Sequence, residues 1–264
     1  MSVAGTNLWM RGSIEFVAVL LGITGSLLID EWREQRSQHR AQLTILESVY
    51  EDILETERFI QEGRMPAFRA DSVWMDFFSE RWDDLDVDSV ARAISRFGTD
   101  ASFHNTFLDF REFHPPISGM ELIMQDGSLK EIRNPEIRRR INTLIKTDLQ
   151  FVLKNVQTEI DMQIGFRQTL VNQNDPRLAR ILSVSQDELQ RGFNGDDSQL
   201  ARQVEELRYV LSKDYVRTYL NLKNRNRYFI MFFIRGFEET LAELKELIEI
   251  ELRAEGRLAG PAPN

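Results

Sequence analysis

The residues most often used for metal binding and proton transfer are scarce in this chain. Its three histidines are His39, His104 and His114, and no two of them have the i, i+4 spacing that places both side chains on one face of a helix. The chain contains no cysteine, which excludes disulfides, thiolate metal sites and cysteine nucleophiles. The sequence therefore predicts no metal site, and it gives no sign of a cofactor.

A run of aspartates, DDLDVD at residues 83–88, has some likeness to a calcium-binding loop. It lacks the internal glycine and the closing glutamate of an EF-hand, so we interpret it as a solvated turn in which Asp86 or Asp88 caps a helix. The sequence also contains no GxSxG, GxxxxGK[ST] or GxGxxG motif. We therefore predict no catalytic residue, and a membrane-tethered enzyme without a local motif is kept as an alternative.

One carboxylate has an unusual setting, because Glu15 lies near the start of the apolar stretch SIEFVAVLLGITGSLLIDEW, residues 13–32. No charged residue occurs from Phe16 to Ile29. A helix of roughly 20 residues matches the ~30 Å hydrocarbon core of a bilayer. We predict a transmembrane helix over 13–32, preceded by an interfacial segment over 1–12. The alternative is a buried helix of a soluble protein, which Glu15 and the short apolar run favour.

Aromatic and basic residues flank this stretch. Trp9 and Trp32 stand where interfacial aromatics are usually found, and we expect Arg11 and Arg33 to lie at the same membrane interfaces. The arginines after the stretch outnumber those before it: Arg33, Arg36 and Arg40 against Arg11. By the positive-inside rule, this bias predicts that the C-terminal bulk of the chain is cytoplasmic.

Small residues recur every four positions within the stretch, at Ala18, Gly22 and Ser26, with Gly25 beside them and Glu15 near the same face. Such spacing allows two helix backbones to approach closely in lipid. Because the chain has one predicted span, a helix–helix interface on this face implies a homo-oligomer. An alternative assembly is an oligomeric ion channel or transducer with Glu15 near the pathway, where a ring of carboxylates would favour cations.

The composition excludes one large class of partner. The chain has 264 residues, a net charge of −9 and a hydrophobic content of 42%. A strongly acidic chain has no basic field for nucleic acid, whereas this apolar content suffices for a real core. The length allows one large domain or two small ones.

Beyond residue 32 the sequence predicts an all-α chain, since apolar residues recur at helical spacings of three and four, as in helical bundles and coiled coils. Gly63 and Pro66 are expected to end the first long helix, and Pro135 to begin the second. The expected segments are a long helix over 33–64, short helices within 66–134 (67–81, 86–97, 101–113 and 117–124), long helices over 135–172 and 198–254, and a disordered tail over 255–264.

The most apolar part of the last helix is YFIMFFIRGF, residues 228–237. Ten residues are too few to cross a bilayer, so we predict a buried central stretch of the bundle. A protein–protein contact or a dip into the membrane surface are the alternatives. The neighbouring arginines, Arg225, Arg227 and Arg235, would suit anionic headgroups if the helix folded back towards a membrane.

Two segments together resemble a bacterial family of single-pass membrane proteins described only as a domain of unknown function. The first is LGITGSLLIDEWRE at residues 21–34, although residues 30–34 replace the family's Asn-Trp-Asn-Glu-like juncture. The second is ISGMELIMQDGSLKEIRNPEIRRRINTLI at residues 117–145, with its short helix, glycine turn and helix start. The resemblance implies a protein of the bacterial inner membrane, and it supplies no activity or site residue.

Taken together, the sequence predicts a membrane-anchored structural, interaction or signalling protein without catalytic activity. We expect it to associate with the lipid bilayer and with further copies of itself, through the predicted span and the helical bundle. An unidentified protein partner is a further expectation, and nucleic acid is not expected.

Overall fold

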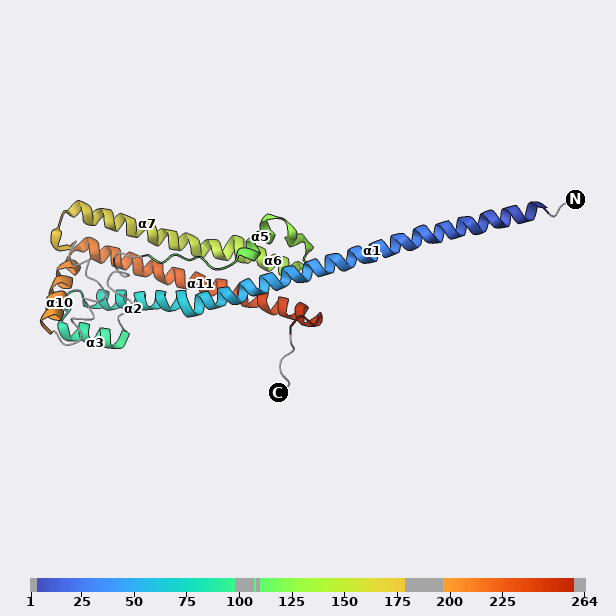
Figure 1. Ribbon diagram of the computed structural model, residues 1–264. Helices are drawn as coiled ribbons and strands as arrows, with labels where there is room; N and C mark the ends of the chain where they lie inside the picture. The colour runs from blue at the N-terminus through green and yellow to red at the C-terminus, as the bar shows by residue number, and fades with distance from the viewer. Residues whose placement is uncertain (1–3, 98–106, 108–109, 179–196, 259–264) are drawn as a thin grey trace, which may run out of the picture.

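The computed structural model describes residues 4–97, 107, 110–178 and 197–258, with the side chains of residues 4–19, 22, 197 and 199 left undescribed. Every regular element within these residues is a helix, which confirms the predicted all-α class. The helices form an elongated bundle from which one long helix projects (Figure 1).

The projecting element is α1, which runs without a break from Ala4 to Arg58. At 1.5 Å per residue its length is about 80 Å. The side chains of residues 26–38 are all exposed, and the first buried residues are Gln42 and Leu43. Close to this point the side chains begin to contact the bundle, where His39 Nε2 lies 3.0 Å from a carboxylate oxygen of Glu255. Nearly two thirds of α1, up to about residue 38, therefore extends beyond the packed domain.

The predicted transmembrane helix lies in this projecting part. Among the helices whose side chains are described, none combines the length and the apolar content needed to cross a bilayer. The transmembrane prediction gains no support from that finding. The first seven residues of the predicted span, 13–19, and residue 22 lie outside the described side chains, as does the interfacial segment over 1–12.

The first long helix does not end at Gly63 and Pro66, so that prediction is wrong. A single π-helical turn, η1 (Phe59–Arg64), joins α1 directly to α2 (Met65–Arg81), and the backbone stays helical through Arg64. The amide of Met65 donates to the carbonyl of Ile60, five residues back. This wider turn accommodates Pro66 because it relieves the clash that a proline ring makes with the carbonyl of residue i−4.

The structure of the segment after α2 agrees in part with the prediction from the sequence. Helix α3 (Val87–Phe97) begins at the predicted cap, where the Ser89 amide donates to the Asp86 carboxylate at 2.6 Å. The run at residues 83–88 is thus a turn and helix cap, as expected. The helix predicted over 101–113 lies mostly outside the described residues, and residues 110–113 are not helical.

Helix α5 (Ser118–Gln125) confirms the predicted short helix and packs against α1. The Met120 amide donates to Asp52 Oδ2 at 2.7 Å, and the Gly119 amide also faces this carboxylate. Burial raises the pKa of Asp52, while the two amides oppose that rise. After α5, Gly127 takes a left-handed turn with φ of 80° and leads into the 3-10 turn η2 (Ser128–Glu131).

The contact between α5 and α1 depends on glycine at position 119. A Cβ there would lie 2.6 Å from Ser48 Oγ and 2.9 Å from Asp52 Oδ2. We expect Gly119→Ala to lower the free energy of unfolding by about 1–3 kcal/mol, measured by urea denaturation. The matched control is Gly165→Ala in a helix with open space at that site, where a gain of about 0.5–1 kcal/mol is expected. Equal effects at both sites would contradict the argument.

The second long helix is confirmed over its whole length. Asn134 caps α6 (Pro135–Thr143) by accepting from the Glu136 amide at 2.9 Å. The chain continues through a π-helical turn, η3 (Leu144–Asp148), into α7 (Leu149–Gln173). Helix α7 ends at Asn174, whose φ of 47° is the left-handed conformation common after a helix end.

The third long helix is two helices, α10 (Asp197–Leu211) and α11 (Asp214–Ala254), so the prediction of one helix over 198–254 is wrong. Lys213 has an extended backbone and starts α11, while the Arg217 side chain donates to the carbonyl of Leu211 at the end of α10. Helix α10 therefore lies across the end of the bundle far from the projection (Figure 1).

The prediction of a disordered tail over 255–264 is wrong for its first four residues. Residues 255–258 form an ordered turn after α11, in which Arg257 approaches Glu47 at 3.3 Å and Leu258 packs on the core. Residues 259–264 lie outside the described part of the chain.

Two apolar cores follow one another along the bundle. The proximal core, nearest the projection, is built from α1, the start of α2, α5, α6, the first part of α7 and the second part of α11; its members include Leu46, Ile53, Phe68, Ile141, Val152, Ile234 and Phe237. The distal core is built from α2, α3, α10, the end of α7 and the start of α11; its members include Trp74, Phe78, Val90, Phe166, Val204 and Tyr219. Helices α2, α7 and α11 cross from one core to the other, and α7 and α11 run side by side (Figure 1).

Candidate functional site

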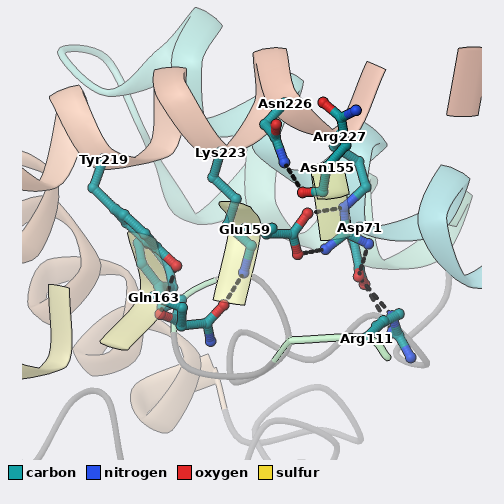
Figure 2. Close-up of polar contacts among 10 residues, drawn as sticks. Asp71, Arg111, Asn155, Glu159, Gln163, Tyr219, Lys223, Asn226 and Arg227 are labelled. Atoms are coloured by element: carbon teal, nitrogen blue, oxygen red, sulfur yellow. Dashed lines mark hydrogen bonds and ion pairs between the residues drawn. The ribbon is translucent and has the colours of Figure 1, made fainter. Parts of the chain in front are cut away.

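A buried polar layer separates the two cores. On α11 it comprises Lys223 and Arg227, which lie between distal Leu220 and proximal Ile230. On α7 it comprises Glu159 and Gln163, and α2 contributes Asp71. All five side chains are at least 98% buried, so the bundle places an ionic cluster where apolar side chains would ordinarily continue. Figure 2 shows this layer.

Arg227 is the centre of the polar layer. Its guanidinium makes a two-point contact with Glu159, in which Nε donates to Oε2 at 2.8 Å and the second nitrogen donates to Oε1. Its remaining terminal nitrogen donates to Asp71 Oδ2 at 3.0 Å. The guanidinium carbon also lies 4.5 Å from the centre of the Phe68 ring. One arginine therefore ties α11 to both α7 and α2.

Asp71 is shared between two arginines. Arg111, on the extended segment before α5, donates from Nε and Nη2 to the two carboxylate oxygens at 2.7 and 2.8 Å. Together with Arg227, it surrounds a carboxylate that is wholly buried. The segment at 110–117 is thereby fixed against α2 without secondary structure of its own.

One turn along α11 from Arg227, Lys223 extends the layer towards the distal core. Its ammonium donates to Gln163 Oε1 at 2.9 Å and lies 5.8 Å from the Tyr219 ring. Tyr219 stacks on Phe166 with ring centres 3.9 Å apart and donates its hydroxyl to the carbonyl of Phe107 at 3.3 Å. Burial raises the pKa of Tyr219. At the other end of the layer, Asn226 donates to the backbone carbonyl of residue 155 at 2.9 Å (Figure 2).

The chemistry of the layer is that of a structural ion network. Both carboxylates already accept from guanidinium groups, so neither is placed as a base towards an open cavity. Buried ion pairs of this kind hold partners in one register, because any slip leaves a charge without its counterpart in a low-dielectric interior. The layer therefore fixes how α2, α7 and α11 align, and it connects the two cores mechanically.

The residues predicted to form a helix–helix interface are on the projecting part of α1, far from this layer. The side chains of Glu15, Ala18 and Gly22 lie outside the described part of the chain. Gly25 has open space around it, and the Ser26 hydroxyl donates to the carbonyl of Ile23 at 2.9 Å. The structure of one chain therefore leaves the predicted interface untested.

The predicted membrane-interface residues lie on the same part of α1. Trp9 and Arg11 are among the undescribed side chains. Trp32 is exposed, with the Arg36 guanidinium carbon 5.3 Å from the centre of its ring, and Arg33 is exposed beside it. The described members of this set thus contact only their own helix.

The histidines have no common site among the described residues. His39 pairs with Glu255, and His114 lies 3.2 Å from Glu112, while His104 is outside the described part. Within the described residues, no group of three or more histidine, cysteine, aspartate or glutamate side chains is arranged to hold a metal ion.

The polar layer was missed from the sequence, although a signal for it exists. Lys223 and Arg227 are four residues apart, at positions of α11 that otherwise face the core with apolar side chains. Glu159 and Gln163 are also four residues apart and hold the corresponding positions of α7. Charged residues at seam positions on two helices are the pattern that a buried ion network produces. The alternative in which Arg225, Arg227 and Arg235 face anionic headgroups does not hold for Arg227, because its side chain is completely buried in the bundle.

Comparison of the chain with protein-family models, with curated proteins and with solved structures found no match. The resemblance to a bacterial membrane-protein family therefore stays a prediction.

Proposed function

We propose that this protein is a membrane-anchored interaction protein, in which the projecting part of α1 is the anchor and the bundle is the part presented to partners. The observation that carries the proposal is a set of large apolar side chains exposed on the projecting part of α1: Leu20, Leu21, Ile23, Leu27, Leu28, Ile29 and Trp32. They are 52–67% exposed and point to most sides of the helix rather than along one stripe. A helix that is apolar all round belongs in a bilayer or within a larger protein core.

The architecture supports an anchor of this kind. Leu20 to Ile29 continue the uncharged run that begins at Phe16, and α1 passes from there into the bundle without a break. The polar layer ties α11 to α7 and α2, which contribute to both cores, so displacement of the anchor would be passed to both cores. A bacterial inner-membrane location with a cytoplasmic bundle is part of the proposal, and the arginine bias after residue 32 supports it.

The anchor is tested by extracting the membranes of cells that express the full chain with alkaline carbonate. We expect the wild-type protein to stay with the membranes. The double variant Leu21→Arg/Ile23→Arg should appear in the supernatant, because two arginines near the centre of a span raise the insertion free energy by roughly 5–7 kcal/mol. The matched control is Leu122→Arg, at an exposed leucine on the bundle, which should stay with the membranes. Release of the wild-type protein by carbonate would overturn the anchor.

Self-association through the face formed by Ala18, Gly22 and Ser26 is the second part of the proposal. Its test is the molar mass of the full chain in mild detergent, measured by light scattering with the detergent contribution subtracted. A defined multiple of 30.9 kDa is expected, and Gly22→Leu should reduce it. A monomeric mass for the wild-type chain would remove self-association while leaving the anchor in place.

A further inference from the structure

Along α11, exposed side chains form a strip that includes the unburied face of the apolar stretch at residues 228–237. Its most exposed aromatic residue is Phe232, at 66%. Three further large apolar side chains on the strip are 46–52% exposed: Leu222, Tyr228 and Phe229. Beside them, the Phe233 ring stacks on Phe151 of α7 with ring centres 5.3 Å apart, so the aromatic surface continues onto the neighbouring helix. A contiguous exposed apolar surface of this kind is typical of an interaction site.

Two opposite charges on the strip lie symmetrically about Phe232. Arg225 is seven residues before it and Glu239 is seven residues after it. Seven residues are close to two helical turns, so all three side chains lie on one face of α11, with the two charges about 21 Å apart. Both charged side chains are exposed, and within the described residues neither takes part in an ion pair.

The positions nearest the centre of the strip are complementary in the same way. Phe229 and Arg235 lie three residues before and after Phe232, and an aromatic ring is a favourable partner for a guanidinium group. Tyr228 and Gly236 lie four residues before and after it, and the space around Gly236 is open. A bulky ring on one side of the centre therefore matches a position without a side chain on the other.

The charges beside the strip are largely satisfied within the chain. Glu243 pairs with Arg140, and Asp76 accepts from the Tyr228 hydroxyl at 2.8 Å. On the side of α2, Glu238 is attracted by both Arg69 and Arg235. Arg225 and Glu239 are thus the pair of opposite charges that the strip offers to a partner.

This symmetry selects one arrangement of two α11 helices. In an antiparallel pair with a two-fold axis at Phe232, each position faces the position at equal distance on the other side of the centre. Arg225 of each copy then faces Glu239 of the other, and the two Phe232 rings meet at the axis. A parallel two-fold pair places every residue opposite itself, so it brings like charges together at both positions.

We propose that the exposed face of α11 binds the same face of a second copy of this chain, antiparallel and centred on Phe232. Aromatic side chains at the centre are buried by the partner, and the two Arg225–Glu239 contacts set the register and the direction. This interface is separate from the predicted self-association through the small-residue face of α1.

The pairing determines where the two projecting helices lie. Within the bundle α1 and α11 run in opposite directions, since Lys245 donates to Glu57 at 2.6 Å and Gln42 donates to Glu251 at 3.3 Å. The projecting part of α1 therefore emerges at the C-terminal end of α11 (Figure 1). In an antiparallel pair the two projections point in opposite directions. If they are membrane anchors, which rests on the proposed function, paired copies join two facing membranes.

The test uses the full chain in nanodiscs of zwitterionic lipid that hold one copy each, so that spans cannot meet within one bilayer. Sedimentation velocity should show reversible pairing of loaded discs as their concentration rises, with empty discs as the blank. Arg225→Glu alone and Glu239→Arg alone should each weaken pairing at least tenfold, because each change places like charges opposite one another at two symmetric positions.

Two further combinations identify the antiparallel arrangement. The double variant Arg225→Glu/Glu239→Arg should pair within about threefold of the wild-type chain, and an equal mixture of the two single variants should pair although neither pairs with itself. Because the two positions are about 21 Å apart on one helix, this recovery cannot arise within one chain. Single variants that pair like the wild-type chain, or a double variant no better than the single ones, would overturn the proposal.

Matched variants locate the pairing on α11. Phe232→Ala should weaken it at least tenfold, whereas Leu122→Ala, at an exposed leucine of α5, should leave it within about twofold. Arg133→Glu makes the same charge change as Arg225→Glu at an exposed position elsewhere and should also leave pairing within about twofold. Equal losses in both charge variants would show a general charge effect and overturn the site, as would binding of loaded discs to empty ones.

The outcome for the pairing is independent of the outcome for the anchor. If alkaline carbonate releases the wild-type chain, the same variants are compared in buffer without discs, since the face of α11 belongs to the bundle. The charge exchange then decides the pairing by itself, and only the joining of two membranes is lost. Absence of pairing by anchored chains in discs overturns this inference and leaves the anchor in place.

Discussion

Arg227→Met is expected to lower the free energy of unfolding by about 3–5 kcal/mol, because it leaves Glu159 and Asp71 buried without their shared cation. Methionine fills much of the same volume, so the lost stability measures the removal of the charge rather than the creation of a cavity. Arg225→Met, two residues earlier on an exposed face of the same helix, should change stability by less than about 0.5 kcal/mol. The measurement is urea denaturation followed by circular dichroism.

A second substitution separates the ion pair from simple packing. In the Arg227→Met background, Glu159→Gln removes the carboxylate that has lost its partner, and it should restore part of the stability. The double variant should therefore lose less than the sum of the two single variants, with a coupling energy of about 1–3 kcal/mol. Additive losses would show that Arg227 and Glu159 do not act as a pair, whatever their geometry.

The polar layer explains why the two cores behave as parts of one bundle. The proximal and distal cores are built mostly on different helices, and among the described helices α2, α7 and α11 contribute to both. The contacts of Arg227 to both Glu159 and Asp71 hold the three helices in one register, because a slip would leave buried charges without their partners.

The parts of the fold that sequence predicts well are those governed by local chemistry. Asn134 followed by Pro135 begins a helix because the side-chain cap and the fixed proline φ act within a few residues. Asp86 caps α3 for the same reason, and Asp126-Gly127 forms the expected turn. Each of these caps and turns is determined by residues within a short segment, so tertiary packing has little influence on it.

The wrong predictions all concern features that depend on the rest of the bundle. A proline usually stops a helix, yet the π-helical turn before Pro66 keeps the backbone helical, and no residue within 59–64 predicts that turn. The break at Lys213 occurs where α10 must cross the end of the bundle, and Arg217 and Asp83 stabilise it from outside the break. The charged residues at core-facing positions can be recognised in the sequence, but their pairing cannot be predicted without knowing which helices face one another.

Phe237→Ala is expected to lower the free energy of unfolding by about 3–5 kcal/mol, whereas Phe232→Ala, five residues earlier in the same apolar stretch, should change it by less than about 0.5 kcal/mol. The prediction that Tyr228 to Phe237 is a buried stretch is confirmed for one face only: Ile230, Met231, Ile234 and Phe237 are buried, and Tyr228, Phe229 and Phe232 are exposed. The Phe237 ring lies edge-on to Phe113 with centres 6.2 Å apart, so its removal leaves a cavity in the proximal core. Urea denaturation of both variants distinguishes the faces, and comparable losses would mean that the exposed aromatics also pack within the folded chain.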